Sequence, residues 1–275
     1  MSNITNYFSS HVFTEDFVQQ PHQATADVNA WVNEQTHGKI SKLFDQDLPS
    51  NTALVLLNAV YFKGTWKTKF DPAKTIKKAM FYLDNVYTAP VEMMNVKSKF
   101  NYAQMEDGQM IELPFQNETN IAMYIFLPSS SSMDKNIISK TFNTAQTLLT
   151  KIEQLREHAV NVHIPKFKFD HNYKLGAVLK KLGIEDALMP GRADFSGING
   201  KQHDLYLSEV IHKTFIEVNE EGSEAAAASG VNIAKMSMPL PSDRAVEFNA
   251  NRPFIFFIRD KLYGVTLFEG IINKP

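Results

Sequence analysis

The chain has 275 residues, 44% of them hydrophobic, and is therefore long enough to bury a large core. Its formal net charge is -2, and no cluster of Lys and Arg indicates a nucleic-acid partner. Cysteine is absent, which excludes disulfides, thiolate catalysis and cysteine-ligated metal sites. The longest apolar run, around residues 54–62, is too short to span a bilayer, so no membrane partner is expected.

The first half of the chain predicts one helix followed by a series of strands. Apolar residues at helical spacing up to Thr36 share one face, and Gly38 is placed to end that helix. Residues 53–62 form a nearly continuous apolar run, as expected of a strand buried on both faces. From residue 80 to residue 126 the pattern predicts strand after strand, interrupted by polar turns.

The second half adds helices between further strands. Apolar spacing over residues 145–155 and again over 175–182 predicts two helices. Phe167 and Phe169 alternate with lysines, which is typical of a strand with one wet face. Residues 254–258 and 262–268 predict two buried strands joined by a short turn, and the mixture indicates an α+β fold.

One stretch, residues 215–229, combines a strand-like beginning with four consecutive alanines. Two acids and Gly222 separate these parts. One interpretation is a short exposed helix capped by Ser223, because alanine is the best helix former. The other is a mobile segment whose small side chains allow it to enter a packed sheet, with glycine as the pivot. On the residues alone, the helix is slightly favoured.

The sequence contains no motif for a catalytic or metal site. A nucleophile elbow, a His-Glu-x-x-His pair and a phosphate-binding glycine loop are all missing. The eight histidines are scattered, and the spacing of His158 and His163 suits neither one strand face nor one helix face for metal binding. We therefore expect no enzyme, no catalytic residue, no metal and no cofactor.

Five short motifs in the chain have a common resemblance. They are residues 220–228, 58–66, 251–254, 193–197 and 268–270. The first, Glu-Glu-Gly-Ser-Glu-Ala-Ala-Ala-Ala, resembles the hinge of inhibitory serpins, the suicide inhibitors of serine proteases. The others resemble further serpin motifs, and they occur in the family's order along essentially the whole chain.

The resemblance implies the serpin fold. This is an α+β fold with a large central mixed β-sheet, further β-sheets, surrounding helices and an exposed reactive loop. We expect a single domain over residues 1–275. Compared with the family's full pattern, roughly the first third is expected to be absent.

The resemblance also implies a set of functional residues. The hinge would consist of Glu220, Glu221, Gly222, Ser223, Glu224, Ala225, Ala226, Ala227 and Ala228. Asn58 and His212 match a polar pair that holds the central strands together, and Trp66 matches a tryptophan at the top of that sheet. Without the resemblance, all three would be interpreted as ordinary core residues satisfied by their neighbours.

The implied activity is inhibition by loop cleavage, insertion and covalent trapping. Family spacing places the scissile bond between Met236 and Ser237, which suits an elastase-like or chymotrypsin-like protease. A shift to Lys235 would suit a trypsin-like protease, and Arg244 is a remote third candidate. The partner would be the target serine protease, and the inhibitor a monomer.

Two further expectations follow from the resemblance. The alternative to an inhibitor is a non-inhibitory or inactive truncated serpin, acting as a binding or carrier protein. The compartment is expected to be secreted and extracellular, although the chain begins without a signal-peptide pattern. Asn3 and Asn117 are glycosylation candidates because each begins an Asn-x-Thr triplet.

Overall fold

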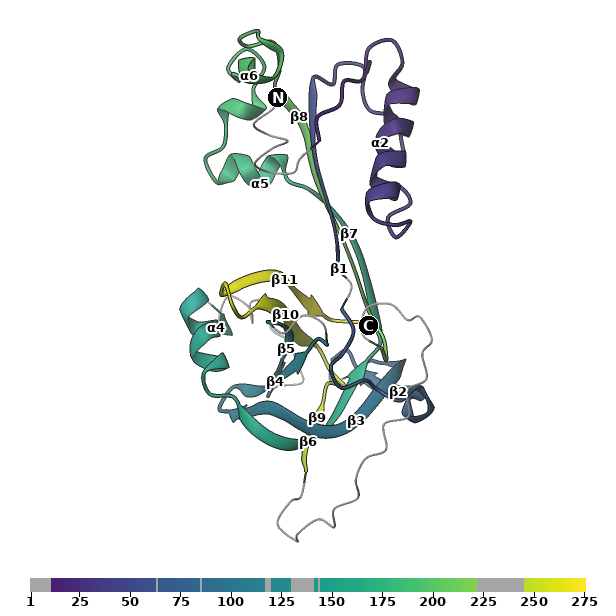
Figure 1. The fold of residues 1–275 in the computed structure, drawn as a ribbon, viewed down its shortest axis with the longest axis vertical. Coiled ribbons are helices and arrows are strands. Elements are labelled where there is room, and N and C mark those ends of the chain that lie inside the picture. Colours follow the sequence, from purple (N-terminus) through teal and green to yellow (C-terminus); the bar gives the residue numbers. More distant parts are fainter. Residues whose placement is uncertain are drawn as a thin grey trace. The chain divides into compact units, whose positions relative to one another are not determined.

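The computed structural model, drawn in Figure 1, combines helices with two sheets. It describes residues 11–62, 64–84, 86–116, 120–129, 141–142, 144–221 and 245–275. The helices are α2 (Pro21–Gln35), η1 (Pro72–Lys74), α4 (Ala145–Ile152), α5 (Gly176–Lys181), η2 (Asp186–Leu188) and α6 (Ser196–Asn199). The strands are β1 (Leu54–Phe62), β2 (Ile76–Tyr82), β3 (Thr88–Met105), β4 (Gly108–Pro114), β5 (Ile121–Pro128), β6 (Arg156–Pro165), β7 (Phe167–Lys174), β8 (Leu207–Val218), β9 (Val246–Asn249), β10 (Phe254–Asp260) and β11 (Val265–Ile272). The predicted α+β class is confirmed.

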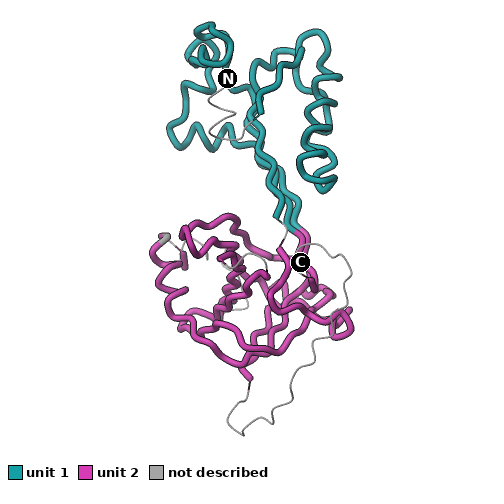
Figure 2. The backbone as a smooth tube through the Cα atoms, in the orientation of Figure 1, with its two compact units in different colours: residues 1–62, 169–216 teal, residues 63–168, 217–275 magenta. Residues whose placement is uncertain are grey.

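The chain divides into two compact units, coloured separately in Figure 2. Unit 1 contains residues 1–62 and 169–216, and unit 2 contains residues 63–168 and 217–275. The single domain expected from the sequence stays a prediction. In the part of the chain that the structure describes, no helix is both long and apolar enough to cross a membrane.

Unit 1 is built on a three-stranded sheet in the order β1-β8-β7. β1 and β8 run parallel, and their register places Leu57 beside Ile211 and Tyr61 beside Phe215. Because side chains alternate between the faces of a strand, these residues share one face, and they pack with α2 through Val32. This apolar cluster explains why α2 and the two strands form together.

The predicted end of α2 is confirmed. Pro21 begins the helix, where a missing N–H leaves no intrahelical bond unmade. Beyond Gln35 the chain turns through His37 and Gly38, both with positive φ, a conformation that glycine adopts without steric cost. The Thr36 hydroxyl then accepts the N–H of Ile40 at 3.1 Å, which fixes the exit of the chain.

Unit 2 is built on an eight-stranded mixed sheet. Its main order is β11-β10-β5-β4-β3-β6-β9, and β2 pairs with β3 beside this path. The long strand β3 pairs with β2 near its beginning and with β4 near its end, while β6 follows its other edge. β9 runs parallel to β6, and the remaining pairs are antiparallel. This sheet contains most of the strands predicted between residues 80 and 126.

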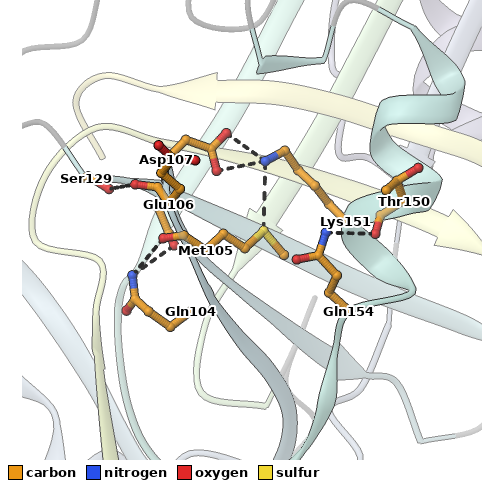
Figure 3. Close-up of polar contacts among 9 residues, drawn as sticks. Gln104, Met105, Glu106, Asp107, Ser129, Thr150, Lys151 and Gln154 are labelled. Atoms are coloured by element: carbon orange, nitrogen blue, oxygen red, sulfur yellow. Dashed lines mark hydrogen bonds and ion pairs between the residues drawn. The ribbon is translucent and has the colours of Figure 1, made fainter.

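Helix α4 covers one face of this sheet and is joined to it by a charged side chain. The Thr144 hydroxyl accepts the N–H of Thr147 and begins the helix. Figure 3 shows Lys151 reaching from α4 to Asp107 in the turn between β3 and β4, with Nζ–O distances of 2.6 and 2.8 Å. Lys151 is only 11% exposed and also lies over the ring of Phe126, 4.9 Å from its centre. The ion pair therefore supports the apolar packing beneath it.

Two predictions of burial were wrong, and one predicted helix is largely exposed. Leu56 on β1 is 52% exposed because it lies on the face opposite α2, so β1 is not buried on both faces. Helix α5 forms where predicted, but none of its residues is buried. Leu262 is 64% exposed because it lies in a turn, where the Asp260 carboxylate accepts its N–H and that of Tyr263.

Candidate functional site

Asn58 and His212 lie at matched positions of β1 and β8. In parallel strands, residues at the same register project to the same face, so the predicted pair is brought together. That face is opposite α2: Asn58 is exposed and His212 is half-buried. The His212 ring stacks on Tyr173 of β7, with ring centres 6.1 Å apart. The two residues are therefore neighbours, but neither is fully buried, and the role assigned to the pair stays a prediction.

Trp66 lies four residues beyond β1, and it holds the chain that follows β8. Its indole Nε1–H donates to the Asn219 carbonyl at 2.9 Å, and its backbone N–H donates to the Glu221 carbonyl at 2.8 Å. The buried ring stacks on Phe115 at 4.7 Å and meets the edge of Phe70 at 6.1 Å. The structure thus places Trp66 against the residues that immediately precede Gly222.

Of the predicted hinge residues, the structure describes Glu220 and Glu221, and Glu220 makes the stronger side-chain contacts. Its side chain is only 9% exposed, and its carboxylate meets Lys166 Nζ at 2.8 Å and the Thr75 hydroxyl at 2.7 Å. Its carbonyl accepts the backbone N–H of Phe70 at 2.9 Å. Lys166 in turn makes a second ion pair, with Glu92 on β3 at 2.9 Å. Two carboxylates therefore share one ammonium group at the base of the hinge.

The charges of this cluster stabilise each other. Burial acts to raise the pKa of Glu220, but hydrogen bonds from Lys166 and Thr75 outweigh it and lower that pKa below 4.5. Burial likewise acts to lower the pKa of Lys166, but its bonds to Glu220 and Glu92 raise that pKa above 10.5. Glu220 and Lys166 are therefore both ionised at neutral pH.

The chain that follows residue 244 is also fastened to unit 2. β9 pairs with β6, and the Ala250 N–H donates to the His163 carbonyl at 2.9 Å. Arg252, in the predicted motif 251–254, donates through Nε and Nη2 to the Pro128 carbonyl at 3.1 and 2.8 Å. Residues 222–244 thus begin and end at segments that are fixed within one unit.

The other predicted site residues lie outside the described part of the chain. They are Gly222, Ser223, Glu224, Ala225, Ala226, Ala227 and Ala228 of the hinge, Lys235, Met236 and Ser237 at the scissile bond, and the glycosylation candidates Asn3 and Asn117. The roles assigned to them stay predictions.

Sequence reasoning missed the partners of the hinge. Phe70, Thr75, Glu92 and Lys166 contact Glu220 or its ion-pair partner, yet they lie 54 or more positions before it in the chain. None of them stands in a motif with a recognisable spacing. Only the fold brings them together.

A family model described as serpin (serine protease inhibitor) matches residues 1–275. The chain belongs to the serpin family. The leukocyte elastase inhibitor of Equus caballus is 39% identical over 282 residues, covering 100% of this serpin and 73% of that protein.

Solved serpin structures share the fold. Native protease nexin-1 with heparin matches with a TM-score of 0.83 and 32% identity, over 100% of this serpin and 72% of that chain. Thyroxine-binding globulin in complex with thyroxine matches with a TM-score of 0.82 and 29% identity, over 100% and 70%. The predicted serpin fold is confirmed, and serine protease inhibition is the activity that the family and its inhibitor relatives support.

The relatives correct the predicted compartment. Leukocyte elastase inhibitors and serpins of the B group match this serpin over nearly its whole length, and these relatives are typically intracellular. The expectation of a secreted, extracellular glycoprotein was therefore wrong. It had been drawn from the family as a whole, whereas the compartment differs between its groups.

Proposed function

We propose that this serpin inhibits a serine protease as a suicide substrate and is not itself an enzyme. Residues 222–236 would be the inserting segment, with the scissile bond between Met236 and Ser237. The observation that carries the proposal is the fastening of Glu220 and Glu221, just after β8, to residues that follow β1. These contacts hold the base of the segment where a strand entering between β1 and β8 would begin.

The first step uses the chemistry of the protease. Its serine oxygen attacks the carbonyl carbon of Met236, and the peptide bond to the nitrogen of Ser237 breaks. The new ester joins Met236 to the protease, while the freed amine of Ser237 takes a proton from the protease's general acid. The inhibitor contributes only the substrate segment.

The second step moves the attached protease. The cleaved segment adds to the sheet as a strand between β1 and β8, which are direct neighbours in the uncleaved chain. Fifteen extended residues at about 3.3 Å each span roughly 50 Å. The acyl-enzyme is thereby carried along the sheet and distorted before water can release it.

Insertion requires small side chains on the face that enters the core. Ser223, Ala225 and Ala227 alternate with Glu224 and Ala226. Because Glu224 needs water, the small residues on the other face are those that would become buried. An arginine at position 225 should therefore stall insertion, whereas an arginine at position 226 should remain in solvent.

A matched pair of variants tests this proposal. We expect elastase to cleave the Ala225→Arg variant without becoming covalently trapped. The Ala226→Arg variant should inhibit elastase about as well as the unmodified chain does. The measurement is the number of inhibitor molecules consumed per protease molecule inactivated. If Ala225→Arg inhibited with the same stoichiometry as Ala226→Arg, strand insertion would not be the mechanism.

We further propose an elastase-like or chymotrypsin-like target for a monomeric inhibitor. Met236 fits an apolar specificity pocket, and a relative named leukocyte elastase inhibitor supports this choice. Lys235 keeps a trypsin-like target as the alternative. A carrier function is the second candidate, because thyroxine-binding globulin has the same fold. The uninterrupted small residues of the hinge favour inhibition.

A further inference from the structure

Lys166 forms ion pairs with two carboxylates, Glu92 on β3 and Glu220 after β8. Its backbone N–H donates to the Glu92 carbonyl at 2.8 Å, next to the paired residues Met93 and Pro165 of β3 and β6. The Glu92–Lys166 contact is therefore part of the strand pairing of unit 2. Glu220 instead belongs to the segment that leads into the hinge.

Insertion acts differently on the two ion pairs. A strand entering between β1 and β8 must separate the residues following β1 from those following β8. It therefore breaks the backbone bonds from Trp66 to Glu221 and from Phe70 to Glu220. Glu220 then loses its fixed position, whereas the pairing that holds Glu92 beside Lys166 is unaffected.

An ammonium group left without a partner in a partly buried site is costly. Glu92 would prevent this, because it meets Lys166 Nζ at 2.9 Å and is held there by the pairing of β3 with β6 rather than by Glu220. Glu92 also places a second negative charge near Glu220, which weakens the hold on the hinge. The groove of about 510 Å³ beside Glu92, Lys166 and Glu217 gives the side chains room to change partners.

We propose that Glu92 is a positioning residue for hinge release: by retaining Lys166, it lowers the barrier to strand insertion. This inference rests on the proposed suicide-substrate function. It predicts that replacing Glu92 slows strand insertion, which is the opposite of what loss of a purely structural contact would do. A residue that only supports the fold would loosen the hinge when replaced, whereas replacement of Glu92 should tighten it, because Lys166 would then pair with Glu220 alone.

The test measures insertion directly. A fluorescent synthetic peptide with the sequence of residues 223–235 is offered to the full chain, and its uptake rate is followed by anisotropy. The variants are Glu92→Gln, the charge-conserving Glu92→Asp, Glu220→Gln and the double variant Glu92→Gln/Glu220→Gln. Stoichiometry of inhibition against elastase is measured in parallel.

We expect Glu92→Gln to take up the peptide about two- to fivefold more slowly, the range for a half-exposed ion pair. Glu92→Asp should restore most of the rate, and Glu220→Gln should exceed the rate of the unmodified chain. The double variant should match Glu220→Gln, because Glu92 acts only through the Lys166–Glu220 pair. In parallel, Glu92→Gln should consume more inhibitor per protease molecule.

Other results would overturn the inference. It fails if Glu92→Gln takes up peptide at the unmodified rate or faster, or if Glu92→Gln slows uptake equally in the Glu220→Gln background. An unmodified chain that takes up no peptide contradicts it as well. Failure of the proposed function would look different. The uptake rates would follow the expected order, but the unmodified chain would form no covalent complex with a protease.

Discussion

Glu220, in the predicted hinge, is held in place by several side chains of unit 2. Its buried carboxylate is paired with Lys166 and Thr75, and its carbonyl accepts the N–H of Phe70. Hydrogen bonds to charged groups contribute more to stability than neutral ones, and a buried partner that is left alone costs more than the bond itself contributed. Replacing the Glu220 side chain should therefore lower the free energy of unfolding even when its shape is kept.

Replacing Glu220 by Gln removes the charge but keeps the shape. We expect Glu220→Gln to lower the free energy of unfolding of the uncleaved chain by about 1–3 kcal/mol, since Lys166 loses its more buried partner. The measurement is urea unfolding. Glu221→Gln is the matched control, because the contacts of Glu221 with Trp66 and Asn219 involve its backbone. An equal loss in both variants would contradict the role given to the Glu220 side chain.

The difference in unfolding free energy between the unmodified chain and Glu220→Gln should depend on pH. The pKa of Glu220 is lowered by folding, so its stabilisation is fully present above 4.5 and is lost as pH falls through the lowered pKa. The pKa of Lys166 is raised, so its share is present below 10.5 and is lost as pH rises through the raised pKa. The difference in unfolding free energy between the unmodified chain and Glu220→Gln should be constant between these limits and shrink on acidification. A difference that grows in acid would refute this assignment.

The side chain of Trp66 combines apolar packing with one hydrogen bond. Trp66→Phe would leave the Asn219 carbonyl without its indole donor and reduce the stacking on Phe115. We expect a loss of about 1–3 kcal/mol in unfolding free energy, measured in urea. Trp31→Phe removes the only other tryptophan, which is half-exposed, and should cost less. Equal costs would show that the indole bond contributes nothing.

How far the sequence predicts the site can be seen from three residues. Trp66 and Asn58 could be chosen because they stand in the motif 58–66, and His212 because the family resemblance pairs it with Asn58. Their surroundings could not be predicted, because burial depends on which face α2 covers. The Lys166–Glu220 pair was inaccessible to sequence reasoning, since its partners lie 54 positions apart and share no pattern.

Elements were predicted best where periodicity was strong and neighbours were local. α2 ends where Gly38 indicated, and β1 fills the apolar run. α5 forms as a helix, but its apolar stripe remains largely exposed, because periodicity reports a potential face and not the partner that covers it. The β10–β11 turn was misplaced because the Asp260 side chain, rather than an apolar boundary, determines where the strand ends.

The attachment of α4 provides a prediction at the same scale. Asp107→Asn should reduce unfolding free energy by about 1–2 kcal/mol, between the values for exposed and buried ion pairs, because Lys151 is largely buried. Urea unfolding measures this loss. The control is Lys99→Gln, which breaks an exposed pair with Glu157 and should change stability by less than about 0.5 kcal/mol. The assignment fails if the two variants lose equal amounts.

For the whole molecule, the fold class followed from the mixture of strand and helix patterns, and the family from motifs spread along the chain. The division into two units could not be predicted, because β7 and β8 each continue from one unit into the other. The compartment could not be predicted either. Nothing in the composition distinguishes the intracellular from the secreted groups of the family.

Loop insertion also predicts a change in global stability. Cleavage within residues 222–244 should raise the midpoint temperature of unfolding sharply, because the segment adds a new strand between β1 and β8 and extends the sheet. Calorimetry before and after limited proteolysis measures this shift. An unchanged or lower midpoint would favour the carrier function, since a carrier does not require insertion.

The most direct test of the proposed inhibition is to incubate the purified chain with elastase and, separately, with trypsin. Denaturing electrophoresis and mass spectrometry then identify the products. We expect a covalent complex with elastase that survives denaturant, together with a released peptide beginning at Ser237. A peptide beginning at Met236 would move the scissile bond to Lys235. Cleavage by both proteases without any covalent complex would contradict the proposed inhibition.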